Sequence, residues 1–257
     1  MPLLVGTSGW QYRDWRGVLY PEGMPQRQWL AHYATTFATV EVNNAFYRLP
    51  ERSTFERWRE QTPGGFVVVI KASRYLTHVR RLADPTEPVA RLTERAAGLG
   101  SRLGPYLLQL PPTLRAAPDR LDACLGAFPR GARVAVEPRH PSWWSDDVRR
   151  VLERHGSALC WADRGGRPIT PLWRTAGWGY LRLHEGRASP PPAYGRTALG
   201  TWLDRIEDTW PGQRDDVFVF FNNDRGGAAV RNARTLVRMA GYRALPTHTT
   251  APAAGER

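Results

Sequence analysis

The segment TVEVNNAFYRLPERSTFERWREQTPGGFVVVIKA (39–72) contains the pattern on which the fold prediction rests. It begins with a short run rich in valine, TVEVN (39–43), and ends with a second such run, FVVVIKA (66–72). Between them, STFERWREQ (53–61) has apolar residues at helical spacing, with Ser53 as a candidate N-cap. A strand, a helix and a strand in this order predict a βαβ unit with parallel strands.

The same alternation continues along the whole chain. Eight runs have the composition of short strands: LLVGTS (3–8), TVEVN (39–43), FVVVIKA (66–72), YLLQL (106–110), RVAVE (133–137), SALCWAD (157–163), GYLRLHE (179–185) and DVFVFFN (216–222). Segments with helical spacing lie between them, at 26–37, 53–61, 89–103, 119–128, 145–156, 198–210 and 228–240. Eight strand–helix repeats within 257 residues match the rhythm of a (β/α)₈ barrel.

We therefore expect an α/β protein with a single (β/α)₈ TIM-barrel-like domain over residues 1–243. A doubly wound open sheet is the alternative, but no G-x-G-x-x-G motif follows the first run. The remaining segment, 244–257, is rich in proline, alanine and threonine and is predicted to be a disordered tail.

Charge and composition narrow the classes of partner. Thirty-six basic residues against 24 acidic ones give a net charge of +12, which favours a polyanionic partner, although the surplus can also serve solubility alone. No apolar run approaches the ~18 residues that span a bilayer, and no basic flank precedes the first apolar stretch, so we expect a cytoplasmic protein without a membrane partner. Cys124 and Cys160 lack metal-ligand spacing and exclude a disulfide framework.

Lysine and asparagine are scarce in this chain. Of the 36 basic residues only Lys71 is a lysine, and asparagine occurs five times. This skew looks like GC-rich coding, so we expect the residues that remain to have roles that arginine or serine cannot fill. Lys71 and four asparagines fall at the ends of predicted strands; the asparagines are Asn43, Asn44, Asn222 and Asn223. The fifth, Asn232, lies in the helix after the last strand.

Period-two alternation predicts which strand side chains face inward. Polar residues alternate with valine and leucine near the carboxyl ends of the strands, where the active sites of barrels lie. The expected catalytic residues are Glu41, Lys71, Glu137, Arg182 and His184. Either glutamate would be the general base, and Lys71 or His184 the acid or electrostatic stabiliser. Lys71 is also a candidate Schiff-base nucleophile. The alternative is a structural ion-pair network that includes Asp163.

Two loops add residues that are expected to bind the substrate. SGWQYRDWRGVLYP (8–21) mixes aromatic residues with arginines, which suits stacking beside phosphate contacts; an aromatic plug is the alternative. NNDRGGAAVRNA (222–233) carries a glycine pair before a helix, which suits an anion; a tight turn is the alternative. The predicted substrate-binding residues are Trp10, Tyr12, Asn43, His78, Gln109, Arg139, Asn222, Asn223, Gly226, Gly227 and Asn232.

Seven stretches in order resemble the YecE-like family, also called domain of unknown function 72. They are GTSGWQYRDWRGVLYP (6–21), FATVEVNNAFYRLP (37–50), FVVVIKASRYLTH (66–78), LLQLPP (107–112), VAVEPRHPSWW (134–144), LRLHEG (181–186) and FFNNDRGGAAVRNA (220–233). The resemblance implies a TIM-barrel fold, a distant relationship to metal-dependent barrel endonucleases that act on damaged DNA, and nucleic-acid binding. It implies no defined activity. It places the family's polar positions on the strand-end residues named above.

The sequence thus predicts an enzyme that acts on a phosphate-bearing, nucleic-acid or nucleotide-like substrate at the C-terminal mouth of the barrel. The expected reaction types are phosphoester hydrolysis and a lyase reaction that proceeds through a Schiff base. A non-catalytic nucleic-acid-binding module and a divalent-metal-dependent enzyme on sugars or phosphoesters remain alternatives. We expect no resident metal or cofactor, because no H-E-x-x-H or comparable spacing occurs and cations at the strand ends compete for the carboxylates.

Overall fold

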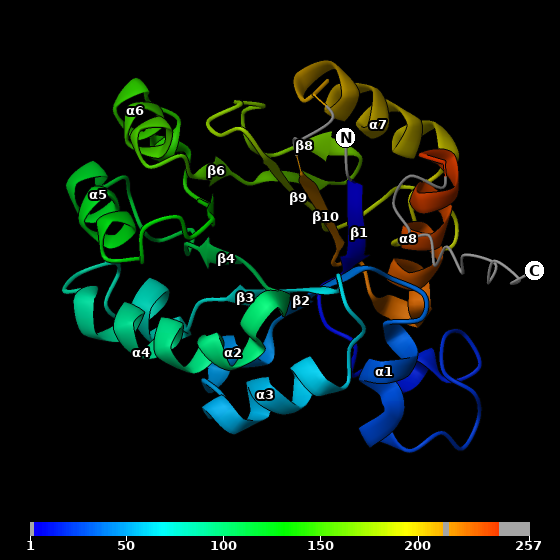
Figure 1. Ribbon diagram of the computed structural model, residues 1–257. Helices are drawn as coiled ribbons and strands as arrows, with labels where there is room; N and C mark the ends of the chain where they lie inside the picture. The colour runs from blue at the N-terminus through cyan, green and yellow to red at the C-terminus, as the bar shows by residue number, and fades with distance from the viewer. Residues whose placement is uncertain (1–2, 213–215, 242–257) are drawn as a thin grey trace, which may run out of the picture.

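The strands of the computed structural model alternate with helices along the chain, and the helices lie outside them (Figure 1). The structure describes residues 3–212 and 216–241. Its strands are β1 (Leu3–Thr7), β2 (Thr39–Val42), β3 (Val67–Lys71), β4 (Leu103–Gln109), β5 (Val134–Glu137), β6 (Ala158–Leu159), β7 (Trp161–Arg164), β8 (Arg167–Pro168), β9 (Gly179–Leu183) and β10 (Val217–Phe221).

The α-helices are α1 (Trp29–Tyr33), α2 (Asn44–Tyr47), α3 (Arg52–Glu60), α4 (Thr86–Ala96), α5 (Pro118–Gly126), α6 (Asp146–Arg154), α7 (Arg196–Thr209) and α8 (Ala228–Met239). A π-helix, Tyr75–Val79, follows β3, and several short 3₁₀ turns join the other elements. Helix α3 begins one residue before the expected Ser53 cap, with Glu51 at the N-cap position. Ser53 therefore lies inside the first turn.

The strands in the described part of the chain form two five-stranded sheets, ordered β1-β10-β9-β7-β8 and β2-β3-β4-β5-β6. Every pairing is parallel except the short β7–β8 hairpin. The predicted α/β class with parallel strands is therefore confirmed, but a closed eight-stranded barrel is not. The expected run 157–163 is split at Cys160 into β6 and β7. The expected tail, 244–257, lies outside the described residues, and the single domain over 1–243 stays a prediction.

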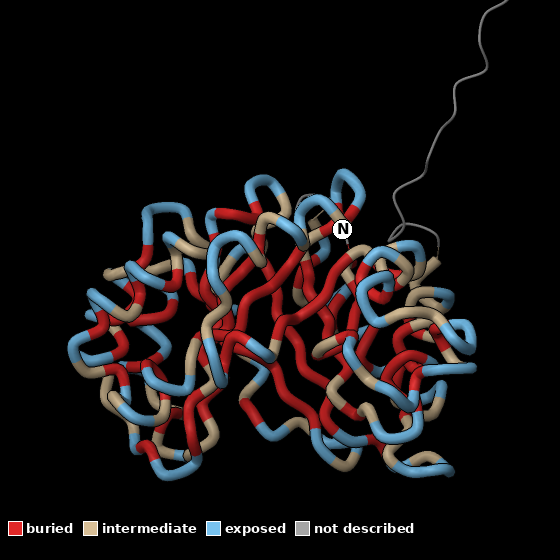
Figure 2. The backbone as a smooth tube through the Cα atoms, turned by 90° about the horizontal axis from the view of Figure 1, so that it is seen from below, coloured by how far each residue is buried: buried red, intermediate tan, exposed pale blue. Residues whose placement is uncertain are grey.

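The alternation of side chains along the strands sorts them into two apolar clusters. Val217, Val219 and Phe221 of β10 pack in the larger cluster, which includes apolar residues of the helices. Phe218 and Phe220 belong to a smaller cluster on the other face of the strands. The strands form the buried centre, and exposed residues lie on the surrounding helices and loops (Figure 2). The face opposite the helices is thus apolar over much of its length and polar where the strands end.

Candidate functional site

A cluster of charged side chains lies at the carboxyl ends of four parallel strands. Glu41 is the third residue of β2, Lys71 the last of β3, Glu137 the last of β5, and Arg182 the fourth of β9. The parallel register aligns these ends, since Glu137 pairs with Gln109, the last residue of β4. The alternation along the strands predicted that these side chains share the strand face opposite the helices. In the structure they lie together at the carboxyl ends of the strands.

Arg182 joins the two carboxylates of this cluster. Its Nη1 donates to Glu137 Oε2 at 2.7 Å, and its Nη2 donates to Glu41 Oε1 at 2.8 Å. The Tyr180 hydroxyl donates to the other oxygen of Glu41 at 2.6 Å. Both glutamates are fully buried and Arg182 is 2% exposed. The three groups thus form a fixed, desolvated network in which each charge has an opposite partner.

The second oxygen of Glu137 carries two further partners. His184 Nε2 lies 2.8 Å and Arg139 Nη2 lies 2.7 Å from Oε1. Asn222 Nδ2 donates to His184 Nδ1 at 3.0 Å, so the proton of the neutral ring belongs on Nε2, where it is donated to Glu137. Burial lowers the pKa of His184 and outweighs the neighbouring carboxylate. His184 is therefore neutral near pH 7 and is held in one orientation.

Glu137 stays ionised in spite of its burial. Desolvation alone raises the pKa of a carboxyl group, but here the charge of Arg182, the hydrogen bond from His184 and the charge of Arg139 together hold it well below its ordinary value. A carboxylate with so low a pKa and no exposed atom is a weak general base. The geometry thus fits Glu137 as the anchor of three donors better than the expected role of proton acceptor.

Lys71 has a different environment from the paired charges. Its side chain is 9% exposed, and its Nζ lies 4.2 Å from the centroid of the Phe46 ring. Within residues 3–212 and 216–241, no carboxylate comes within ion-pair distance of this amine. Burial, followed by the charge of Arg182, lowers the pKa of Lys71 from 10.5 to about 8. At pH 7 roughly one-tenth of the amine is therefore neutral, and the neutral share rises to about half at pH 8.

Aromatic side chains lead from Lys71 to the surface. The ring of Phe46, in α2, meets the His78 ring edge-on at 5.0 Å and the Tyr47 ring edge-on at 5.1 Å. Tyr47 is 82% exposed, and Tyr75, in the same π-helix as His78, is 51% exposed. The exposed residues Arg48 and Arg74 flank these tyrosines in the sequence.

The sequence analysis did not assign Phe46, Tyr47, Tyr75 or Tyr180 to the site. A signal for the first three was present, because NNAFYRLP (43–50) and SRYLTH (73–78) follow two predicted strands directly. Loops at that end of parallel strands carry the functional side chains. Tyr180 could be recognised only as an inward-facing residue two positions before Arg182.

Two predicted polar residues lie at the ends of strands that contribute to the cluster. Asn43 directly follows β2, and its Oδ1 atom is buried without a hydrogen-bond partner in the described residues. Gln109 ends β4 and is half-buried. Their assignment to substrate binding stays a prediction.

Asn223 and Asn232 have hydrogen-bond partners within the protein, and their expected role in substrate binding stays a prediction. Asn232 Oδ1 accepts from the Tyr194 N–H at 3.0 Å, and its Nδ2 donates to the Tyr194 carbonyl at 2.9 Å. Asn223 Nδ2 donates to Asn232 Oδ1 at 2.9 Å and to the Pro192 carbonyl at 3.0 Å. Both amides thus hold the segment 192–194 against α8. Three of these four hydrogen bonds join the backbone, which gives asparagine a structural role at both positions, while Asn223 Oδ1 is buried without a partner in the described residues.

The glycine pair at 226–227 is already occupied by a carboxylate. Both glycines have positive φ, 63° and 72°, as a tight turn requires. The Gly226 N–H donates to Asp14 Oδ2 at 3.1 Å. Asp224 lies two residues before Gly226, and burial, together with the charge of Asp14, raises the pKa of Asp224 to about 6. Two acidic side chains at the turn oppose a bound phosphate, so the tight-turn alternative fits better.

The aromatic loop after β1 packs inward. Trp10 is 4% exposed and meets Trp58 edge-on at 5.2 Å. The Tyr12 hydroxyl donates to the Ser8 carbonyl at 2.6 Å, and its ring lies against Trp15. Of the two alternatives, the aromatic plug agrees with this packing, whereas a stacking surface needs exposed rings.

Asp163 does not join the charged cluster. It accepts from the Tyr194 hydroxyl at 2.7 Å and from Trp202 Nε1 at 3.1 Å. No group of three histidine, cysteine, aspartate or glutamate side chains in the described residues is placed to hold a metal ion. Of the helices in residues 3–212 and 216–241, none combines the length and hydropathy needed to cross a bilayer.

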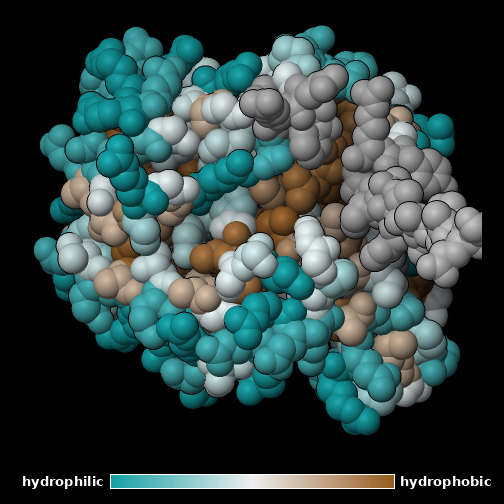
Figure 3. All heavy atoms as spheres, in the orientation of Figure 1, coloured by the Kyte–Doolittle hydropathy of each residue, from teal (hydrophilic) through white to brown (hydrophobic). Residues whose placement is uncertain are grey.

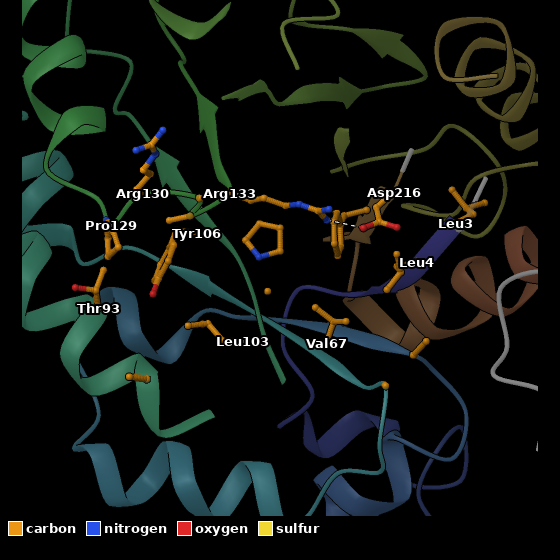
Figure 4. Close-up of a pocket in the computed structure, with 18 residues that line it drawn as sticks. Leu3, Leu4, Val67, Thr93, Leu103, Tyr106, Pro129, Arg130, Arg133 and Asp216 are labelled. Atoms are coloured by element: carbon orange, nitrogen blue, oxygen red, sulfur yellow. Dashed lines mark hydrogen bonds and ion pairs between the residues drawn. The ribbon is translucent and has the colours of Figure 1, made fainter. Parts of the chain in front are cut away.

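A cavity of about 810 Å³ lies at the opposite ends of the strands (Figure 4). Leu4, Val67 and Leu103 from the strand starts line it, together with the ion pair between Arg133 and Asp216. Apolar side chains also gather in the hollow at the centre of the face drawn in Figure 3. This cavity shares no residue with the charged cluster. The molecule therefore has an apolar hollow at one end of its strands and a polar cluster at the other.

Two named proteins from bacteria are similar to this chain in sequence. UPF0759 protein YecE of Escherichia coli K12 is 34% identical over 146 residues, which cover 56% of this chain and 50% of YecE. The matched part of this chain thus spans about half the length of YecE. UPF0759 protein YunF of Bacillus subtilis is 23% identical over 273 residues, which cover 92% of this chain and 94% of YunF.

Solved structures of similar proteins cover almost the whole fold. A crystal structure of a DUF72 family protein from Thermotoga maritima has a TM-score of 0.80 and 27% identity, and the match covers 93% of this chain and 99% of that one. A DUF72 family protein from Enterococcus faecalis has a TM-score of 0.77 at 18% identity over 92% of this chain and 94% of that one, a likeness of fold alone. A family model described as "Protein of unknown function DUF72" matches residues 4–256. This chain therefore belongs to the DUF72 family.

Proposed function

We propose that this chain binds a phosphate-bearing ligand with nucleobases, a nucleotide or a single strand of nucleic acid, and acts on it at the carboxyl ends of the strands. The observation that carries the proposal is Lys71, an amine without an ion-pair partner in the described residues, which lies over the Phe46 ring. That ring in turn meets the ring of the exposed Tyr47, and the exposed Tyr75 lies in the π-helix that carries His78. Exposed aromatic rings next to cations match the two parts of such a ligand, since bases stack and phosphates pair with positive charge.

The charges of the cluster favour an anion over a cation. Glu41 and Glu137 are neutralised by Arg182 and Arg139, so Lys71 contributes the unbalanced charge. Arg139 is 17% exposed, and its Nε atom is buried without a partner in the described residues. A phosphate oxygen placed between Lys71 and Arg139 would satisfy both donors.

Arg182, Glu41 and Glu137 would act from beneath this anion. They are too deeply buried to touch a large ligand, but they fix the positions of Arg139 and His184 through Glu137. We therefore assign the three as positioning residues, in place of the general-base role expected of the glutamates.

We also infer that the two sheets close into one (β/α)₈ barrel, which would make the charged cluster its mouth. Two contacts support closure. Ser8, just after β1, forms a parallel bridge with Glu41 of β2, and the Gly9 N–H donates to the Glu41 carbonyl at 2.8 Å. Cys160 alone separates β6 from β7, and its N–H donates to the Val136 carbonyl at 2.8 Å. One interrupted strand would thus connect both sheets.

Binding of a fluorescent oligothymidylate of about 12 nucleotides tests the proposed function by anisotropy. Tyr47→Ala and Tyr75→Ala should each weaken binding about tenfold, because stacking contributes about 1–3 kcal/mol per base. Leu172→Ala, at an exposed apolar residue on another loop, is the matched control and should leave binding unchanged. Affinity should also fall between about 50 mM and 200 mM salt. Absence of binding at the lower salt, or equal binding by all variants, would refute the proposal.

A further inference from the structure

We infer that Lys71 is a nucleophile that forms an imine with an aldehyde or ketone carbon of the ligand, so that this site serves carbonyl-bearing phosphate compounds. The inference deepens the proposed function and rests on it for the position of the phosphate. The juxtaposition that carries it is a buried primary amine on an aromatic face, between fixed guanidinium groups and a histidine.

The neighbours of Lys71 favour the neutral amine. Both terminal nitrogens of Arg182 are bound to glutamates, so its positive charge cannot swing away from the cluster. Arg139 adds a second fixed positive charge through Glu137. An amine that is desolvated beside cations loses its proton more readily and becomes a better nucleophile. Glu41 and Glu137 oppose this effect, but Arg182 and burial outweigh them, and the pKa of Lys71 falls to about 8.

The aliphatic stem of Lys71 has little freedom to leave this position. The side chain is buried, and the Phe46 ring lies 4.2 Å from Nζ. Phe46 itself is 8% exposed and is held between the rings of Tyr47 and His78. The amine is therefore held in one position with 9% of its residue surface exposed, and a covalent step requires a nucleophile that is fixed in this way.

His78 can move the protons of the reaction. Its Nδ1 is bound to Thr77 Oγ1 at 2.9 Å, and its Nε2 has no hydrogen-bond partner in the described residues. Burial, and after it the charges of Lys71 and Arg74, lower the pKa of His78, so the ring is a neutral base near pH 7. Lys71 and His78 both contact the Phe46 ring, so the two side chains lie near each other.

Imine formation at Lys71 releases water as its only by-product. The lone pair of Nζ attacks the carbonyl carbon, the C–N bond forms, and the C=O π pair moves to oxygen, which takes up one proton from solvent. His78 removes a proton from the new ammonium nitrogen and returns it to the hydroxyl group. The hydroxyl then leaves as water, and the nitrogen lone pair completes a protonated imine.

The presence of one lysine in the chain makes the experiment specific. The protein is incubated with pyridoxal 5′-phosphate or with the smaller glycolaldehyde phosphate, reduced with borohydride, and analysed by intact mass and peptide mapping. We expect one adduct on Lys71 that forms with half-maximal extent near pH 8. Lys71→Arg keeps the charge and should abolish that adduct, leaving only reaction of the terminal amine. His78→Gln should slow adduct formation without changing the pH midpoint set by Lys71.

The outcomes separate this inference from the proposed function. Reaction of Lys71 with the phosphorylated aldehydes at least tenfold above unphosphorylated pyridoxal and glycolaldehyde supports both. Equal reaction with phosphorylated and unphosphorylated aldehydes keeps the nucleophile but refutes phosphate recognition. Oligothymidylate binding that depends on Tyr47 and Tyr75, with no adduct on Lys71 from either aldehyde, overturns the imine alone.

Discussion

Arg182 shows how one guanidinium can pair with two glutamates that have no exposed surface. The guanidinium donates one hydrogen bond to each carboxylate, and Tyr180 and His184 donate to the remaining carboxylate oxygens of Glu41 and Glu137. Removing one partner from such a network leaves a buried charge unpaired, which costs far more than the pair itself contributes.

Glu137→Gln tests the anchoring role of this residue. The amide cannot balance Arg182 and Arg139, so we expect the free energy of unfolding to fall by about 3–5 kcal/mol in urea titrations. Glu153→Gln breaks an ion pair with Arg149 whose side chains are 43% and 46% exposed, and it should cost less than about 1 kcal/mol. Equal losses for the two variants would contradict the network.

Lys71→Met should stabilise the protein near neutral pH. The folded state lowers the pKa of Lys71 from 10.5 to about 8, so between these values the unfolded chain binds a proton that the folded chain does not. Wild-type stability from this group therefore rises as pH increases from about 8 to 10.5, by about 3 kcal/mol in total. Urea titrations at pH 7 should show the variant to be more stable, with the difference shrinking by pH 9.5. A variant that is less stable at pH 7 would contradict this account.

At the scale of single residues, alternation along a strand predicted Glu41, Glu137 and Arg182 correctly as neighbours. The sequence could not show which of these side chains form hydrogen bonds with each other, because the partners come from strands far apart in the chain. It also could not show that the Gly226 N–H would be taken by Asp14, more than 200 residues earlier. Anion binding at that turn stays a prediction, and an anion there would have to compete with this distant carboxylate.

Among the elements, α2 and the π-helix determine the surroundings of Lys71. Both are short, and a helix of four residues has no sequence periodicity that distinguishes it from a loop. The longer elements were predicted well, since each of the eight expected strand runs overlaps an observed strand. β4 begins three residues before the expected run 106–110. In the run 157–163, pairing to different neighbours divides one apolar stretch into β6 and β7.

The link between α8 and segment 192–194 rests on Asn232. Asn232→Ala removes both hydrogen bonds to the Tyr194 backbone and leaves buried polar groups unsatisfied, so we expect a loss of about 2–3 kcal/mol. Hydrogen exchange at the Tyr194 amide should accelerate markedly. Asn44→Ala is the control, because in the described part of the chain its exposed side chain is hydrogen-bonded only to Gln11. An unchanged Tyr194 exchange rate would show that the segment is held by other contacts.

At the scale of the whole molecule, the closure of the two sheets into one barrel can be tested by hydrogen exchange. If the sheets form one barrel, the N–H groups of Gly9 and Cys160 make hydrogen bonds inside a continuous sheet. Their amide hydrogens should then exchange with solvent as slowly as the amide hydrogens of β3 and β5. Native-state hydrogen exchange followed by NMR measures this directly. Rapid exchange at both amides, with protected neighbours in each sheet, would indicate two separate sheets.

A polar cluster lies at the carboxyl ends of the strands and a largely apolar cavity at their other ends. The sequence predicted only the polar cluster. Polar residues at the carboxyl ends stood out against the apolar runs. The cavity at the other end is lined by leucine, valine, glycine and proline from many segments, and such residues are indistinguishable from core in a sequence. Its volume arises from how strand starts and loops fit together, which alternation alone does not encode.

The central claim is that Lys71, which has no ion-pair partner in residues 3–212 and 216–241, meets a phosphate-bearing ligand. Because the chain has one lysine, protein grown with ¹³C,¹⁵N-lysine gives one Cε–Hε signal in NMR, and its shift against pH reports the pKa of Lys71 alone. We predict a midpoint near 8 that moves upward when a phosphate-bearing ligand such as oligothymidylate is added. A midpoint near the ordinary 10.5 that the ligand does not alter would contradict the account.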